Sequence, residues 1–117
     1  QVMVYADGDR MYRVFQNLIG NALKYSLEGS RIYISLKTEK NAAVADIRNT
    51  SRSELKQDVD FTARFTRGDE SRTDGGSGLG LSIAKSFTEA CGGTFEVETM
   101  ADLFTVKVSF EQKKCNV

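Results

Sequence analysis

The chain has 117 residues, enough for one domain with a sizeable hydrophobic core. Its 16 Lys and Arg residues balance its 16 Asp and Glu residues, so there is no overall basic field, and binding to nucleic acid or anionic lipid is not expected. The sequence contains no histidine, which excludes Ser/His catalytic triads, most catalytic zinc sites and the commonest general base.

No apolar run approaches the roughly 18 residues of a membrane span, and no signal peptide opens the chain. We therefore expect a segment that lies in the cytoplasm and not in a membrane. Cys91 and Cys115 are too few and too far apart for a zinc framework, so reduced structural thiols are expected. Because Gln1 is not an initiator and a strand-like sequence follows at once, residues 1–117 are interpreted as one domain of a longer protein.

The first predicted elements are a short strand and a long amphipathic helix. Residues 2–5 are apolar and strand-like, and either Asp7 or Asp9 can cap the helix that follows, which is expected to end near residues 27–29. Apolar side chains recur in this helix at helical spacing and would make a stripe broad enough to pack on a sheet. The stripe consists of Val14, Phe15, Leu18, Ile19, Ala22 and Leu23.

A second stripe of the same helix is polar and contains Asn17, Asn21 and Lys24, with Arg13 and Tyr25 at its margins. Amide oxygens are suitable ligands for a hard cation such as Mg²⁺, and a lysine ammonium suits a phosphate oxygen. The stripe therefore fits a metal–triphosphate ligand. Taken alone, an ordinary solvated helix face explains it at least as well, so a second phosphate-type motif is needed.

Two antiparallel strands are expected next. Residues 31–38 alternate apolar and polar side chains, which is the period of a half-buried strand. Lys40 and Asn41 turn the chain back, and residues 42–48 form the second strand. Residues 49–51 lie at the end of this strand, a place where functional residues commonly lie.

The second half of the chain begins with a long polar stretch, residues 51–76, with few apolar anchors. Its length is typical of functional or disordered connections, and we expect it to be mobile without a ligand. Helical periodicity returns over residues 78–91 and ends at the glycine pair 92–93. Residues 94–100 and 103–110 then predict a hairpin.

A second phosphate-type motif lies at the start of the later helix, in GGSGLGLSIAK at residues 75–85. Glycines at positions 76, 78 and 80 allow close approach of the backbone and expose N–H groups where the helix dipole favours an anion. The motif is not a Walker A loop, because no Lys-Ser/Thr follows the glycines, and not a dinucleotide fingerprint, because no strand precedes them. By itself it fits a flexible linker as well as a phosphate cradle.

Taken together and in this order, three motifs resemble the catalytic, ATP-binding domain of bacterial sensor histidine kinases. The N box is NLIGNALKYS at residues 17–26, the F box is FTARFTRGDESR at residues 61–72, and the second glycine box is GGSGLGLSIAK. The resemblance covers nearly the whole chain and implies a two-layer α/β sandwich, the Bergerat ATP-binding fold. Its sheet is expected to be mixed, with about five strands, helices on one face and a flexible ATP lid.

The resemblance also implies roles for individual residues. Asn17 and Asn21 would bind Mg²⁺ between the ATP phosphates, while Lys24 and Tyr25 would contact phosphate or ribose oxygens. Arg67 would reach the γ-phosphate, and together with Asn17 and Lys24 it is a catalytic candidate. The second glycine box would frame the lid hinge and the phosphates through Gly76, Ser77, Gly78, Leu79, Gly80 and Leu81.

The sequence departs from the family at the first glycine box, which usually has Asp-x-Gly-x-Gly to bind the adenine amino group. Here the strand ends in Asn49-Thr50-Ser51-Arg52, so Asn49 takes the place of the carboxylate and the glycines are absent. An amide oxygen still accepts a hydrogen bond, but charge-assisted hydrogen bonds are roughly twice as strong. We therefore expect weaker adenine recognition than in members that keep the carboxylate.

The implied function is to bind Mg-ATP and to donate its γ-phosphoryl group to a histidine of a separate dimerisation domain, within a two-component sensor kinase. Phosphoryl transfer depends mainly on positioning and charge stabilisation, so a domain without a titrating base can contribute to it. Because the segment has no histidine, we expect that it does not phosphorylate itself. The implied partners are ATP, the dimerisation domain and a response regulator, in a homodimeric parent protein of the bacterial membrane.

Two other functional classes share features with this sequence. ATPases of the gyrase, mismatch-repair and heat-shock chaperone kind, and a serine kinase that restrains sigma factors, have the same sandwich, but their lids are less similar and they normally keep the aspartate. A non-enzymatic adaptor would keep the shape for protein contacts alone. Titration with an ATP analogue and Mg²⁺ separates these possibilities.

Overall fold

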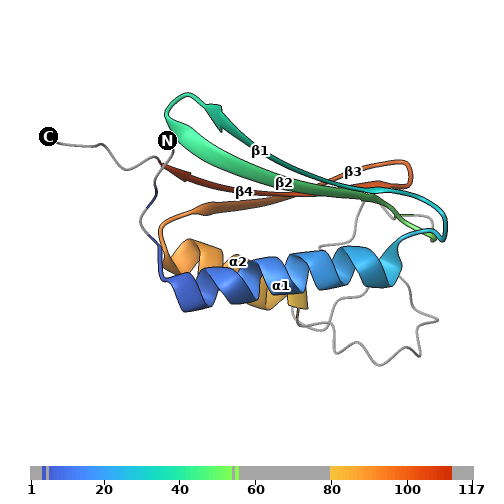
Figure 1. The fold of residues 1–117 in the computed structure, drawn as a ribbon, viewed down its shortest axis with the longest axis horizontal. Coiled ribbons are helices and arrows are strands. Elements are labelled where there is room, and N and C mark those ends of the chain that lie inside the picture. The colour runs from blue at the N-terminus through green and yellow to red at the C-terminus, as the bar shows by residue number, and fades with distance from the viewer. Residues whose placement is uncertain (1–3, 5, 54, 56–79, 112–117) are drawn as a thin grey trace, which may run out of the picture.

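A computed structural model of the protein describes residues 4, 6–53, 55 and 80–111, which form two layers (Figure 1). One layer is a four-stranded sheet, and the other consists of two helices that cover one of its faces. In chain order the elements are α1 (Gly8–Tyr25), β1 (Ile32–Glu39), β2 (Ala42–Thr50), α2 (Gly80–Ala90), β3 (Thr94–Met100) and β4 (Leu103–Glu111). Neither helix of this part is long and apolar enough to cross a membrane. The expected two-layer α/β sandwich is confirmed.

The sheet has the strand order β1-β2-β4-β3, and every neighbouring pair in the described residues is antiparallel. Over the described residues it differs from the expected mixed sheet of about five strands, because it has four strands and no parallel pair. The connection from β2 through α2 leads to β3, which runs parallel to β2. The two strands are not neighbours, because β4 lies between them. The strand expected over residues 2–5 lies outside the described residues except for Val4, which is not in a strand.

Both hairpins turn at the two-residue loops that the sequence predicts. Lys40 and Asn41 have φ angles of 44° and 69°, and Ala101 has a φ of 53°. Positive φ angles at these positions match the twist of the loop to that of the strands. Pairing continues past the expected end of β2, so that Asn49 is itself a member of the strand.

Helix α1 is capped by Asp7, whose carboxylate accepts hydrogen bonds from two backbone N–H groups of the first turn, at 2.9 and 3.2 Å. An N-terminal carboxylate satisfies donors that have no partner within the helix and interacts favourably with the helix dipole. The helix ends at Tyr25, earlier than expected, because the chain beyond it pairs with β2. The N–H of Leu27 donates to the carbonyl of Thr50 over 2.8 Å.

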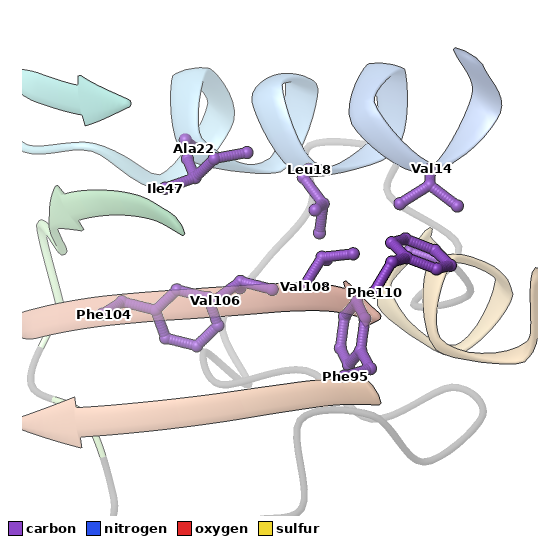
Figure 2. Close-up of a cluster of buried hydrophobic side chains, with 10 residues drawn as sticks. Val14, Leu18, Ala22, Ile47, Phe95, Phe104, Val106, Val108 and Phe110 are labelled. Carbon is purple, nitrogen blue, oxygen red and sulfur yellow. The ribbon is translucent and has the colours of Figure 1, made fainter. Parts of the chain in front are cut away.

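The hydrophobic core lies between the helices and the sheet (Figure 2). Its buried members are Val14, Leu18 and Ala22 of α1, Ala84 of α2, and Ile47, Phe95, Phe104, Val106, Val108 and Phe110 of the sheet. The predicted apolar stripe of α1 is only partly buried, because Ile19 and Leu23 are 36% and 67% exposed. Helix α1 packs against β2 and α2. Ile19 and Leu23, at the border of the apolar stripe, remain in contact with solvent.

Strand β1 is an edge strand and is not half-buried, so that prediction was wrong. Ile34 pairs with the buried Ile47 and therefore lies with Leu36 on the helix side of the sheet. These two side chains are nevertheless 55% and 80% exposed. The helices contact β2 and β3 and leave this edge uncovered (Figure 1).

The face of the sheet opposite the helices is organised around a buried carboxylate. Asp46 is 2% exposed and accepts a hydrogen bond from the Ser35 hydroxyl at 2.7 Å. The Nε atom of Arg48 and the Nζ atom of Lys37 lie 3.6 and 3.9 Å from its two oxygens. Because side chains alternate along a strand, these groups lie on the opposite side of the sheet from Asn49.

Candidate functional site

The polar face of α1 is formed as the sequence predicts. Asn17, Asn21 and Lys24 are each half-buried, and the helical period places them on one side of the helix. Buried Leu18 and Ala22 fix the helix beside them against the core. Two amides and one ammonium group are thus held on a rigid element and remain partly accessible to a ligand.

Backbone hydrogen bonds join the last turn of α1 to the end of β2. The carbonyl of Tyr25 accepts from the N–H of Arg52 over 3.0 Å, and Ser26 pairs with Ser51 in an isolated bridge. The N–H of Ser51 also donates to the carbonyl of Asp102, in the turn between β3 and β4, over 2.7 Å. The first-glycine-box position is therefore held between the N-box helix and this turn.

Asn49, at the position where the resemblance predicts an aspartate, is 3% exposed. It pairs with Ile32 of β1 and with Phe104 of β4, so it lies in the interior of the sheet. It shares the helix-covered face with Ile47, because side chains two positions apart lie on the same side of a strand. A buried amide at this place can accept a hydrogen bond from a ligand or donate one to it.

Tyr25 has two cationic neighbours at this junction. The Lys24 ammonium nitrogen lies 5.5 Å from the centre of the Tyr25 ring, and the guanidinium carbon of Arg52 lies 5.9 Å from it. Both distances are within the range of cation–π attraction. Sequence patterns identify Lys24 and Tyr25 but miss Arg52, whose only signal is its position directly after the strand end.

Two members of the second glycine box are described, and both lie at the start of α2. Gly80 is the first helical residue and Leu81 follows it, each half-buried, and Leu81 packs against the core. A Cβ atom on Gly80 would meet none of the described residues within 4 Å. The other candidates, Arg67, Gly76, Ser77, Gly78 and Leu79, lie outside the described residues, as does most of the stretch expected to be mobile.

The residues of the α1 face fit a magnesium–nucleotide ligand. The amides of Asn17 and Asn21 are one helical turn apart and partly accessible, so two neutral oxygen ligands are available on the same side of α1. Mg²⁺ in phosphate sites usually keeps several waters and takes only one or two protein oxygens besides the substrate. The neighbouring Lys24 adds positive charge for the phosphates.

Comparison with known proteins gives a consistent result. The model of the family described as histidine kinase-, DNA gyrase B- and HSP90-like ATPase matches residues 6–113. The sensor histidine kinase HprS of Escherichia coli is 38% identical over 92 residues, which cover 78% of this chain and 20% of that protein. The sensor histidine kinase RppB of Synechocystis sp. is 32% identical over 114 residues, covering 92% of this chain and 25% of that protein. The chain thus spans a fifth to a quarter of the length of these relatives.

Two experimental structures have the same fold. The mycobacterial sensor histidine kinase MprB superposes with a TM-score of 0.81 at 24% identity, covering 96% of this chain and 78% of that one. The catalytic domain of the histidine kinase ThkA, in a nucleotide-free form, gives a TM-score of 0.75 at 22% identity and covers 93% of this chain and 70% of that one. The arrangement of α1, α2 and the sheet is therefore shared with these domains.

Proposed function

The chain belongs to the family of histidine kinase-, DNA gyrase B- and HSP90-like ATPases, and from this membership we propose that it is the catalytic domain of a bacterial sensor histidine kinase. It binds Mg-ATP and donates the γ-phosphoryl group to a histidine of a separate dimerisation domain. The observation that carries this proposal is the junction of α1 with β2, which holds Lys24 and Tyr25 of the N box next to the end of the strand that contains buried Asn49.

In this proposal each described site residue has one task. The amide oxygens of Asn17 and Asn21 would hold Mg²⁺, which would neutralise part of the charge of the phosphates. Lys24 and Tyr25 contact phosphate or ribose oxygens, and the buried amide of Asn49 accepts from the adenine amino group. Gly80 and Leu81 place backbone N–H groups of the first turn of α2 toward the phosphates.

The remaining roles fall on residues outside the described part and rest on the motifs alone. Arg67 of the F box is proposed to reach the γ-phosphate, where a planar guanidinium suits the charge. Gly76, Ser77, Gly78 and Leu79 are proposed to form the lid hinge and to let the backbone approach the phosphates.

The phosphoryl acceptor lies outside this chain, which has no histidine. We propose that residues 1–117 form one domain of a homodimeric, membrane-bound sensor kinase whose dimerisation domain carries the acceptor histidine and whose phosphate passes to a response regulator. This domain binds the nucleotide, orients it and stabilises its charge. Positioning and charge stabilisation account for most of the catalysis of phosphoryl transfer.

Calorimetric titration with a non-hydrolysable ATP analogue, with and without Mg²⁺, tests the proposal. We expect binding that requires Mg²⁺, and transfer of label from γ-labelled ATP only when the dimerisation domain is added. Absence of binding would instead favour an adaptor that keeps only the shape. Steady ATP hydrolysis without an acceptor would favour an ATPase of the gyrase or chaperone kind.

A further inference from the structure

Strand β1 lies at one edge of the sheet and exposes apolar side chains to solvent (Figure 1). Among the described residues only β2 pairs with it, so its outer row of backbone N–H and C=O groups has no neighbouring strand. Tyr33, Ile34 and Leu36 are 56%, 55% and 80% exposed. A long, apolar edge strand of this kind is a template for pairing with another strand.

Strand β1 also lacks most of the features with which natural edge strands avoid pairing. Such features include short length, proline, bulges and charged side chains. Strand β1 is eight residues long, contains no proline and pairs with β2 without a bulge. The ammonium of Lys37 lies 3.9 Å from the carboxylates of Glu39 and Asp46, so its charge is balanced on the open face of the sheet, opposite the helices.

The other edge of the sheet, β3, is protected by its charges. Glu96 and Glu98 are both exposed and share the open face, because side chains two positions apart lie on the same side of a strand. If two copies paired along the middle of β3 about a two-fold axis, these carboxylates would oppose one another. Like charges directly opposite each other destabilise a sheet. Of the two edges, β1 is therefore the one that favours pairing.

We propose that β1 pairs antiparallel with β1 of a second copy of this chain about a two-fold axis, which gives one continuous sheet across both copies. Such an axis keeps the helices of both copies on the same side of the sheet, so side chains that oppose each other belong to the same face. With the axis at Ser35, Ile34 of each copy opposes Leu36 of the other. The exposed apolar side chains of the helix side thus meet in the middle of the interface.

The charges at the ends of the paired strands are complementary in this register. Arg31, which directly precedes β1, opposes Glu39, and Tyr33 opposes Lys37, and the symmetry repeats both pairs. An axis at Ile34 would instead put Arg31 opposite Lys37, which are like charges. An axis at Leu36 would leave Arg31 beyond the paired residues. Charge complementarity therefore selects a second copy in one register.

The helix side of this edge has apolar surface that a second copy would shield. A groove of about 670 Å³ separates α1 from the edge strand, and Phe15 and Leu36 lie in its wall. Ile19 and Leu23 follow Phe15 at intervals of four residues, so they lie on the same flank of α1, and they are 36% and 67% exposed. Apolar side chains of the second copy would lie at the mouth of this groove, and removal of this surface from water favours association.

The proposed contact leaves the candidate nucleotide site free. Asn17 and Asn21 follow Arg10 by two and three helical turns and share its flank of α1. This flank faces α2, because the guanidinium carbon of Arg10 lies 5.8 Å from the centre of the Phe87 ring. Pairing through β1 occurs on the other flank, so it should neither require nucleotide nor compete with it.

Sedimentation equilibrium of the 117-residue chain tests the proposal over a wide range of chain concentrations. The mean mass should rise from 13.0 kDa toward twice that value and then stop, with or without Mg-ADP. Leu36→Lys should weaken the dimer roughly tenfold or more, because it removes an apolar contact twice and places a charge in the interface. Met100→Lys is the matched control, since Met100 is an exposed apolar residue of the opposite edge strand and its substitution should not change association.

Reversal of charge tests the register. Arg31→Glu should weaken the dimer because it opposes Glu39 of the second copy, and adding Glu39→Arg should restore association. A chain that stays monomeric at every concentration would overturn the proposal and leave this edge to a different strand. Growth beyond a dimer would also overturn it, since it indicates open-ended pairing of β1 with β3. Equal association of Leu36→Lys and the unsubstituted chain, or no rescue by the double reversal, would contradict the proposed contact. Thermal unfolding of each variant verifies that it is folded.

Discussion

At the scale of single residues, Asn49 of the first glycine box, where the sequence departs from the family motif, is buried. Asn49 is 3% exposed in the interior of the sheet, so a charge there has little access to water. An amide avoids the desolvation cost that a buried carboxylate would carry without a ligand. The neutral side chain can also rotate its NH₂ group toward a ligand, which a carboxylate cannot do.

Asn49→Asp should therefore strengthen binding of ADP and sharpen its preference over GDP. A charge-assisted bond to the adenine amino group should add on the order of 1 kcal/mol of affinity, provided that the side chains in place of the missing glycines do not block the base. Without ligand the same variant should be less stable, because the new carboxylate is buried. Calorimetry with both nucleotides and urea unfolding measure the two effects. If affinity and selectivity stayed the same, adenine would be bound by some other group.

Thr88 of α2 is a second residue at which substitution should have a predictable effect on stability. It is fully buried, and its hydroxyl oxygen has no hydrogen-bond partner among the described residues. Thr88→Val keeps the shape and removes the unsatisfied hydroxyl, so it should raise the free energy of unfolding by about 1 kcal/mol. Thr88→Ala removes a methyl group as well and should lower it by a similar amount. Urea unfolding of both variants distinguishes this from a hydroxyl satisfied by a buried water, for which Val would be destabilising.

At the scale of elements, α1 uses different faces for packing and for binding. Val14, Leu18 and Ala22 hold it on the sheet, while Asn17 and Asn21 stay half-buried on another side. Changes on the binding face should therefore affect ligands and not the fold.

Asn21→Ala should abolish Mg²⁺-dependent nucleotide binding and leave the unfolding temperature nearly unchanged, since alanine is the best helix former. Gln16→Ala, on the exposed side of the same helix, is the matched control and should bind normally. Calorimetry with ADP, with and without Mg²⁺, measures the effect. Survival of Mg-ADP affinity in Asn21→Ala would show that the N-box assignment is wrong.

The connection from α2 to β3 depends on a close approach of backbone to an aromatic ring. Gly92 has a φ of 84°, the left-handed conformation that ends many helices, and Gly93 follows it. A Cβ atom on Gly93 would lie 2.5 Å from Cε1 of Phe110, a core residue that is 9% exposed. The ring would have to move within a packed core.

Gly93→Ala should thus lower the free energy of unfolding by about 1–3 kcal/mol through overpacking. Gly20→Ala in the middle of α1 is the control, because a Cβ atom there meets nothing within 4 Å and should stabilise by about 0.5–1 kcal/mol. Chemical denaturation of both variants gives the comparison. Adding Phe110→Leu to Gly93→Ala should restore part of the loss, and no restoration would show that contact with the Phe110 ring is not the cause.

At the scale of the whole molecule, the candidate site belongs to no single element. It draws on α1, the end of β2 and the first turn of α2, and the turn between β3 and β4 fixes the strand end through Asp102. These segments separate on unfolding, so a nucleotide should bind the folded chain alone.

Mg-ADP at about 100 times its dissociation constant should therefore add about 2.7 kcal/mol to the free energy of unfolding. For a domain of this size, that corresponds to a rise in Tm of roughly 10 °C. Differential scanning calorimetry at several ADP concentrations measures the shift. A Tm that does not depend on ligand, despite measurable binding, would mean that the unfolded chain binds nucleotide as well.

The sequence by itself determined the order and type of the described elements after the first strand, because local rules govern them. Helical and alternating periodicity located α1, α2 and all four strands, and the two turns follow as the residue pairs left between consecutive predicted strands, Lys40-Asn41 and Ala101-Asp102. The polar face with Asn17 and Asn21 also follows directly from helical spacing. These features depend only on residues that are close together in the chain.

Tertiary structure alone decided which apolar residues are covered and which distant groups meet. Ile34 and Leu36 alternate like a half-buried strand, yet β1 is exposed because the helices stop short of the sheet edge. Arg52 reaches Tyr25 only because β2 pairs past its expected end with the last turn of α1. Periodicity in the sequence shows which side chains share a face of a helix or strand. Whether that face is buried, and which residues lie near it, depends on how the other elements pack, and this packing is set by contacts between residues far apart in the sequence.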